Sequence, residues 1–236
     1  MDSIAPLRDI RRSRHGEVMA RRSRDRPADG ANTRISARNR KTILDAAIRV
    51  FTEKGYDGAS IAEIAALSGL PKANVYYYFG SKQAIYRTLI ADVLSEWDKA
   101  LTLLREERDP AEALADYIRA KLDFTRRHAA ESRMFANEAV HGGRFMSRGD
   151  RAHIRAATLS RVKVLEAWME AGKMDRVEPI HLFIMLWAST QYYADFDILA
   201  RSGLGSGRIT AADYDRAAET ITRIILKGCG IRRRRS

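Results

Sequence analysis

Hydrogen-bonding side chains gather in the short stretch from Ser60 to Lys82, which reads SIAEIAALSGLPKANVYYYFGSK. Val75 and Phe79 lie four residues apart, so both are expected to pack inward from one face of a helix. The outer face then carries basic, amide and phenolic groups, from Lys72, Asn74, Tyr77 and Tyr78. Amines and phenols donate hydrogen bonds to phosphate oxygens, and an amide can pair with the edge of an adenine. This pattern predicts recognition of double-stranded DNA.

Two short helices joined by a tight turn would position these groups. Ser60 can cap the first helix and Glu63 can reach back to it, which is the spacing of a capping box. Gly69 ends that helix, and Pro71 suits the first turn of the next one. A short polar helix beside a tight turn is typical of a helix-turn-helix motif.

Positive charge is concentrated at the two ends of the chain. The 236 residues carry a formal net charge of +12, with an Arg-rich segment at residues 1–33 and a run of arginines in residues 232–236. We expect residues 1–33 to be a disordered basic arm, which could place Arg21, Arg22 or Arg24 in a DNA minor groove. The alternative is that the basic ends only aid solubility.

The rest of the chain shows the apolar spacing of helices and no convincing strand. Helices are expected at about residues 36–54, 82–105, 110–128, 130–140, 150–171, 179–201 and 210–227. With the two helices of the motif, this gives an all-α fold of about nine helices. The expected organisation is an arm at 1–33, a three-helix DNA-binding domain at 34–81, a helical ligand-binding and dimerisation domain at 82–231, and a basic tail at 232–236.

Several classes of protein are not favoured by the sequence. The single cysteine, Cys229, allows no disulfide within the chain, which suits a cytoplasmic protein. No apolar run reaches the length of a membrane span. The histidines lack metal-ligand spacing, and GLGSG follows no strand, so it is a poor phosphate loop. We therefore expect no enzymatic activity, no metal and no cofactor.

Several motifs keep both the order and the spacing of a known family. These are IL-x-AA-x-x-x-F-x-x-x-G-Y from Ile43, the stretch SIAEIAALSGLPKANVYYYF, and SK-x-AI after it. Together they resemble the N-terminal region of TetR/AcrR-type transcriptional regulators. The segments DYIRAKLDFTRRHAAESRMF, AWMEAGKM and HLFIMLWASTQYYADF are similar to the branch of that family containing the bacterial pyrimidine-utilisation regulator.

The resemblance implies a homodimer with a DNA-binding domain and a ligand-responsive helical domain. It implies contacts to the DNA backbone from Ser60, Lys72, Tyr76, Tyr78 and Lys82, and places Ala73, Asn74 and Tyr77 at base edges. Asn74 can bond an adenine twice, and the Ala73 methyl can meet a thymine methyl. The alternatives are a packing role for Tyr76 and solvated surface lysines at 72 and 82.

A second set of residues could form a ligand pocket. Trp187, Gln191 and Asp195 have the spacing of one helix face, and Gln191 offers a donor and an acceptor that match the edge of a uracil-like ring. Trp187 and Trp97 could stack on such a ring from opposite sides. The candidate ligand-binding residues are Trp97, Tyr117, Phe135, Trp187, Gln191 and Tyr192. The alternative is that both tryptophans are plain core residues.

The expected function is therefore a sequence-specific DNA-binding transcriptional regulator, a cytoplasmic bacterial repressor that binds a palindromic operator as a homodimer. A small ligand, with a pyrimidine or a related nucleobase or catabolite as the candidate, would release or modulate it. The alternative is an architectural or weakly specific nucleic-acid-binding protein. That protein would bind with a large salt dependence and little sequence preference.

Overall fold

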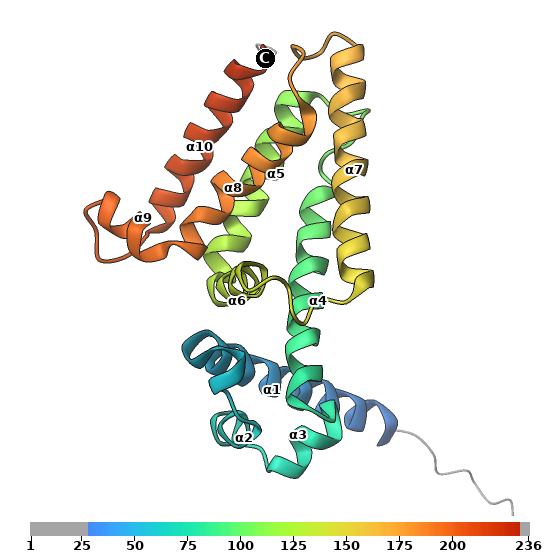
Figure 1. Ribbon diagram of the computed structural model, residues 1–236, viewed down its shortest axis with the longest axis vertical. Helices are drawn as coiled ribbons and strands as arrows, with labels where there is room; N and C mark the ends of the chain where they lie inside the picture. The colour runs from blue at the N-terminus through green and yellow to red at the C-terminus, as the bar shows by residue number, and fades with distance from the viewer. Residues whose placement is uncertain (1–27, 232–236) are drawn as a thin grey trace, which may run out of the picture. The chain divides into compact units, whose positions relative to one another are not determined.

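The all-α fold expected from the sequence is confirmed. The computed structural model describes residues 28–231, which form ten helices and no strand (Figure 1). The helices are α1 (Ala28–Gly58), α2 (Ile61–Ser68), α3 (Lys72–Phe79), α4 (Lys82–Leu101), α5 (Pro110–Arg127), α6 (Ala129–Val140), α7 (Arg148–Glu170), α8 (Pro179–Asp195), α9 (Asp197–Gly203) and α10 (Ala211–Gly228).

Three of the expected helices differ from those in the structure. Helix α4 ends at Leu101 rather than near residue 105. Helix α1 begins at Ala28 rather than near residue 36, and its regular part ends at Gly55, which has a left-handed φ of 68°. The helix expected at 179–201 is two helices, because the backbone of Phe196 is not helical, with φ −117° and ψ 41°. Neither glycine nor proline marks Phe196, so the break left no signal in the sequence.

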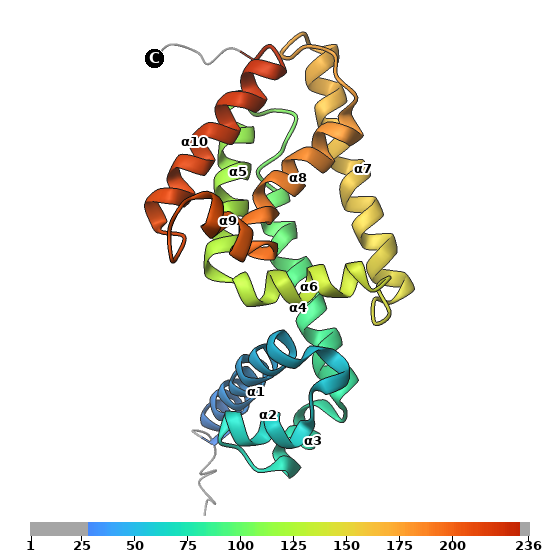
Figure 2. The same ribbon diagram turned by 60° about the vertical axis from the view of Figure 1, so that its left-hand side comes forward.

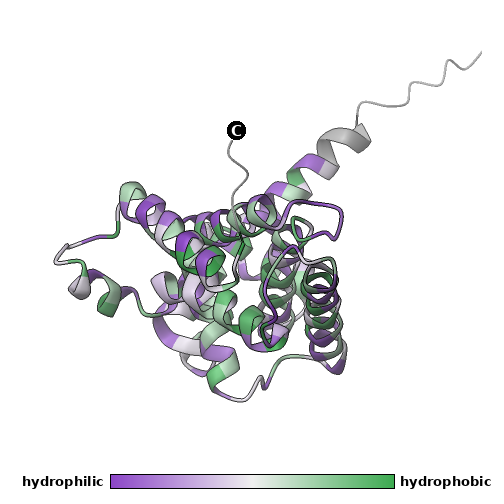
Figure 3. Cartoon of the chain, turned by 90° about the horizontal axis from the view of Figure 1, so that it is seen from above, coloured by the Kyte–Doolittle hydropathy of each residue, from purple (hydrophilic) through white to green (hydrophobic). Residues whose placement is uncertain are grey.

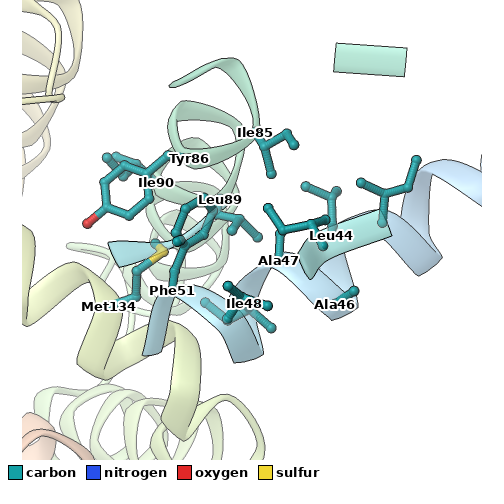
Figure 4. Close-up of a cluster of buried hydrophobic side chains, with 14 of the residues drawn as sticks. Leu44, Ala46, Ala47, Ile48, Phe51, Ile85, Tyr86, Leu89, Ile90 and Met134 are labelled. Atoms are coloured by element: carbon teal, nitrogen blue, oxygen red, sulfur yellow. The ribbon is translucent and has the colours of Figure 1, made fainter. Parts of the chain in front are cut away.

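The first hydrophobic core joins α1 and α4 with the short helices between them. Figure 4 shows side chains of α1 and α4 gathered with Met134 of α6. Val75, expected to pack inward, is buried in this core with Ile43, Val50, Phe51 and Ile64, while Leu70 and Phe79 pack against it half-buried. Residue contacts divide the chain after Ala37, inside α1, and the contacts of both cores belong to the unit that begins at Arg38.

The second core lies between α5, α8 and α10. Helix α5 contacts both of the others, and the three helices lie side by side in Figures 1 and 2. Hydrophilic and hydrophobic residues alternate along the helices in Figure 3, as expected when one face of a helix is buried. Trp168 of α7 is fully buried, and its indole Nε1 donates a hydrogen bond to the Glu106 carbonyl at 3.0 Å.

Residues 1–27 of the expected basic arm, which include Arg21, Arg22 and Arg24, and the whole expected tail at 232–236 lie outside the described residues. Within residues 28–231, no helix combines the length and the apolar character needed to span a bilayer.

The capping box at the start of α2 is present as expected. The Glu63 backbone N–H donates to Ser60 Oγ at 3.2 Å, and the Ser60 N–H donates to the Glu63 carboxylate at 3.0 Å. We expect Ser60→Ala to lower the free energy of unfolding by about 1 kcal/mol, because an orphan N–H of the first turn loses its acceptor. Urea denaturation measures this, with Ser60→Thr as the control that keeps the hydroxyl. Equal stability of the two variants would contradict the capping role.

Candidate nucleic-acid interface and effector cavity

Helix α3 is held on the fold by the turn before it and by its own inner face. Gly69 ends α2 with a left-handed φ of 68°, and the Leu70 N–H then donates back to the Ala65 carbonyl at 3.3 Å. Pro71 follows as the N-cap of α3. Val75 is fully buried and Phe79 packs half-buried against the same core. The opposite face of α3 is therefore directed away from the core.

The outer face of α3 carries most of the residues expected at DNA. Tyr77 is 83% exposed and Tyr76 is 47% exposed, so Tyr76 does not take the packing role considered as its alternative. Lys72 and Ala73 are also exposed, and Asn74 is half-buried. The helix thus presents an amine, an amide and two phenols within two turns, close enough together to contact phosphates and base edges in one groove.

Tyr78 differs from its two neighbours in being tied to the fold. It is half-buried, and its hydroxyl accepts a hydrogen bond from Asn39 Nδ2 of α1 at 3.3 Å. The phenol therefore lies beside Asn39 of α1 rather than standing free. It joins α3 to α1, a contact that the residue spacing did not reveal.

Lys82 has a role that neither sequence interpretation included. Its ammonium donates to the carbonyls of Tyr56 at 2.7 Å and of Ala59 at 2.8 Å, and it lies 4.3 Å from the centre of the Tyr56 ring. It therefore satisfies two backbone acceptors that follow the non-helical Gly55, where the regular part of α1 ends. Lys82 is neither a freely solvated lysine nor a side chain free to reach DNA in this structure. The Ser60 hydroxyl is likewise engaged, in the capping box of α2.

A cavity of about 270 Å³ lies among α4, α5, α6, α7 and α8. Four of the six candidate ligand-binding residues line it, namely Trp97, Tyr117, Phe135 and Trp187. The Trp97 ring lies 4.5 Å from the Phe135 ring and 5.9 Å from the Trp187 ring, centre to centre. The two indoles meet edge to face at 79°, so they contact each other directly instead of facing each other across a gap. We refer to this space as the aromatic cavity.

Gln191 and Tyr192, the other two candidates, lie outside the cavity wall. Gln191 is 3% exposed, and its Oε1 accepts a hydrogen bond from Lys121 Nζ at 3.2 Å while its Nε2 donates to Ser132 Oγ. Both ends of the amide are thus used inside the protein. Tyr192 is 43% exposed and stacks on Phe196 at 5.3 Å, on the outer side of α8. Helical spacing predicted that Trp187 and Gln191 share the face that lines a pocket. In the structure Trp187 lines the cavity, and Gln191 does not.

Lys121 is a buried polar residue of the cavity that was not among the candidates expected from the sequence. It lines the cavity, is 1% exposed, and its Nζ lies 4.3 Å from the centre of the Trp97 ring. Burial lowers the pKa of its ammonium to about 7, partly opposed by the charge of Asp195. Lys121 follows Tyr117 by four residues, on the apolar face of α5, and this spacing was the available signal.

A short polar chain continues behind Lys121. Beyond Gln191, Ser132 Oγ donates to Asp195 Oδ1 at 2.8 Å. Burial raises the pKa of the Asp195 carboxyl, while the hydrogen bond from Ser132 and the charge of Lys121 act in the opposite direction. Asp195, expected on the face of Trp187, is therefore linked to the cavity only through two other side chains.

The segment between α6 and α7 joins the cavity to the first core. Phe145 lies against Tyr56 and Tyr86, with ring centres 3.9 Å and 5.2 Å away. The next residue, Met146, lines the aromatic cavity. Arg144, on the other side of Phe145, pairs with Asp57 at 3.2 Å. A change of shape in the cavity therefore has a path of direct contacts to the end of α1 and to α4.

The part of the chain that the structure describes contains no group of His, Cys, Asp or Glu side chains suited to hold a metal ion. The polar groups of the cavity wall are instead Lys121, Thr158 and the pair formed by Asp98 and His153, whose Nε2 lies 2.8 Å from Asp98 Oδ2. Such a wall suits binding of a small molecule, because aromatic rings surround a few polar groups.

Comparisons with known proteins agree with both halves of the structure. The family of bacterial regulatory proteins named tetR matches residues 43–89, and the family described as YcdC-like protein, C-terminal region, matches residues 90–232. The transcriptional regulator RutR of Escherichia coli K12 is 32% identical over 199 residues, covering 84% of this chain and 94% of that protein. The transcriptional repressor NicS of Pseudomonas putida is 28% identical over 170 residues, covering 70% and 79%.

Solved structures share the fold. The TetR family regulator PfmR from Thermus thermophilus matches with a TM-score of 0.64 and 22% identity, over 78% of this chain and 97% of that chain. AibR, solved with isovaleryl coenzyme A and operator DNA, matches with a TM-score of 0.58 and 21% identity, over 79% and 97%. The two family matches and the identity to RutR show that the chain belongs to the TetR family of bacterial transcriptional regulators, as a DNA-binding protein of the RutR-like branch and not an enzyme.

Proposed function

We propose that this regulator represses transcription by binding a palindromic operator as a homodimer, and that a pyrimidine or a related nucleobase or catabolite in the aromatic cavity releases it. The observation that carries the proposal is the outer face of α3, where Ala73, Asn74 and Tyr77 stand clear of the hydrophobic core. In a helix-turn-helix protein, this is the face that enters the major groove.

The side chains of α3 divide between positioning and reading. Lys72 and Tyr76 are exposed donors that can hold phosphates, which fixes the helix in the groove without selecting a sequence. Asn74 and Tyr77 supply the groups that discriminate between bases. One helix of this length reads few base pairs, so a second copy related by two-fold symmetry is needed for useful affinity. That symmetry leads to the palindrome.

A stripe of exposed side chains on α8 supports the homodimer. Its members follow helical spacing along the outer side of the helix and continue into α9, as Met185, Ala188, Tyr192, Phe196 and Leu199. The small residues Ala194, Ala217 and Ala218 of α8 and α10 are buried within their own chain, so they serve intramolecular packing. The interface we propose therefore rests on the larger apolar side chains.

The double variant Tyr192→Asp/Phe196→Asp is expected to be monomeric, because two like charges would face their counterparts across a two-fold axis in an apolar contact. Sedimentation velocity measures the oligomeric state, and circular dichroism checks the fold. The control is Val140→Asp, which places the same charge at an exposed apolar residue of α6. A double variant that stays dimeric would place the interface elsewhere.

The nature of the effector follows from the cavity and from the similarity of the C-terminal half to the pyrimidine-utilisation regulator. Five aromatic side chains surround a space of about 270 Å³, which favours a small planar molecule. They are those of Trp97, Tyr117, Phe135, Phe183 and Trp187. The cavity borders α4 and, through Phe145, contacts the end of α1. A ligand that fits one arrangement of these helices better than another would change the population able to bind DNA.

Selection of duplexes from a random pool by the full-length protein tests the proposal. We expect enrichment of one two-fold symmetric sequence. A thermal-shift screen of pyrimidines, purines and their catabolites should then identify a compound that makes the protein release this duplex. An architectural protein would instead bind random and enriched duplexes equally, with a steep dependence on salt. That outcome would refute the proposed function.

A further inference from the structure

We infer that the aromatic cavity accepts a small molecule whose planar ring carries a carboxylate, and that Lys121 Nζ binds this carboxylate. The inference rests on the proposed function for the existence of an effector, but it names a chemical class that the function alone does not. It distinguishes an acidic ring compound from a neutral nucleobase.

The ammonium of Lys121 is buried without an ion-pair partner in the described part of the chain. Its Nζ has one hydrogen-bond partner, the neutral amide of Gln191, and its other close neighbours are the rings of Trp97 and Phe124. No ion pair among the described residues 28–231 includes Lys121, and Asp195, whose charge acts on it, is bonded to Ser132. A buried ammonium without a partner is costly, and an anion in the cavity would remove that cost.

A second hydrogen-bond donor, beside Lys121, is also unused within residues 28–231. The indole Nε1 of Trp97 is buried and has no hydrogen-bond partner among the described residues. Buried indole N–H groups normally find an acceptor. Lys121 and Trp97 both line the cavity and contact each other at 4.3 Å, so one ligand can reach both residues. Two neighbouring donors suit the two oxygens of a carboxylate.

The other charged side chains near the Lys121 ammonium have partners of their own. Asp98 and His153 share the cavity wall, but they pair with each other at 2.8 Å. Asp195 of α8 lies behind Gln191 and is bonded to Ser132, while Arg133 of α6 donates to the Ala194 carbonyl. Lys121 is therefore the one cation of the cavity wall without an acidic partner in the described part of the chain, and the rest of the lining is mainly apolar.

Isothermal titration of the full-length protein at pH 6.5 tests the inference with two matched pairs, orotate against uracil and benzoate against benzamide. We expect the acid of each pair to bind at least about tenfold more tightly than its neutral partner. Lys121→Met should abolish that preference, while Lys163→Met, at an exposed lysine of α7, should keep it.

Proton uptake supplies an independent readout. Because burial holds the pKa of Lys121 near 7, binding of an anion should draw a proton onto it at pH 7.5, seen as a binding heat that depends on the buffer. The uptake should persist in His153→Gln, which removes the imidazole of the wall, and vanish in Lys121→Met. Equal binding of acids and neutral partners, or unchanged preference in Lys121→Met, would overturn the inference. A neutral ligand that still released DNA would leave the proposed function standing.

Discussion

Asn74→Ala is expected to weaken binding of the dimer to its enriched duplex by about 2–6 kcal/mol, because a lost two-point contact to a base costs about 1–3 kcal/mol and the dimer loses it twice. Asn74 is half-buried on the outer side of α3, next to exposed Ala73. Because the amide is uncharged, the salt dependence of binding should not change. Fluorescence anisotropy at several salt concentrations measures both quantities.

The control for this prediction is Asn137→Ala, which removes an exposed amide from α6. It should leave affinity for the enriched duplex unchanged. Binding of Asn74→Ala to random DNA should also match that of the wild type. An equal loss on random and enriched duplexes would show that Asn74 serves general affinity and does not read bases.

The stability of the wild type relative to Lys121→Met is expected to rise by about 2 kcal/mol between pH 7 and pH 9. Burial lowers the pKa of Lys121 to about 7, from 10.5 in the unfolded chain. Between these values the unfolded chain binds more protons than the folded one, so the free energy of unfolding increases with pH. Below about pH 7 the ammonium is charged in both states, and its full burial penalty remains.

Chemical denaturation of both proteins from pH 6 to pH 9 gives this difference, in which groups common to both proteins cancel. Lys163→Met is the matched control, because the same substitution at an exposed lysine should give a difference that is flat with pH. A flat difference for Lys121→Met would mean that the Lys121 ammonium stays charged in the folded protein throughout this range.

Local sequence signals predicted the helix-turn-helix region well, because its helices are short and capping residues or glycines mark their ends. The capping box at Ser60 and the left-handed Gly69 fix α2, and buried Val75 fixes which face of α3 is free. Lys82 shows the limit of this reasoning. Its hydrogen bonds to the carbonyls of Tyr56 and Ala59 span more than twenty residues of sequence, and no local pattern encodes them.

For the helices around the aromatic cavity, only the approximate bounds and the apolar faces could be predicted from the sequence. Helical spacing places Trp187 correctly, but the direction of each neighbouring side chain depends on how α5, α6 and α8 pack together. Gln191 therefore meets Lys121 and Ser132 instead of the cavity wall. In the sequence, Lys121 interrupts the apolar spacing of α5, and this alone does not show that its side chain is buried. In the structure Lys121 is buried in the cavity wall.

The most direct test of the account is the affinity of the full-length protein for its enriched duplex, measured with and without the compound that gives the largest thermal shift. The account predicts that the compound weakens DNA binding at least about fivefold, which is the usual lower range of coupling between two sites. It also predicts that Trp97→Ala, which alters the cavity wall but not α3, keeps DNA affinity and loses the response. A compound that binds in the cavity and leaves the affinity for DNA unchanged would contradict the account.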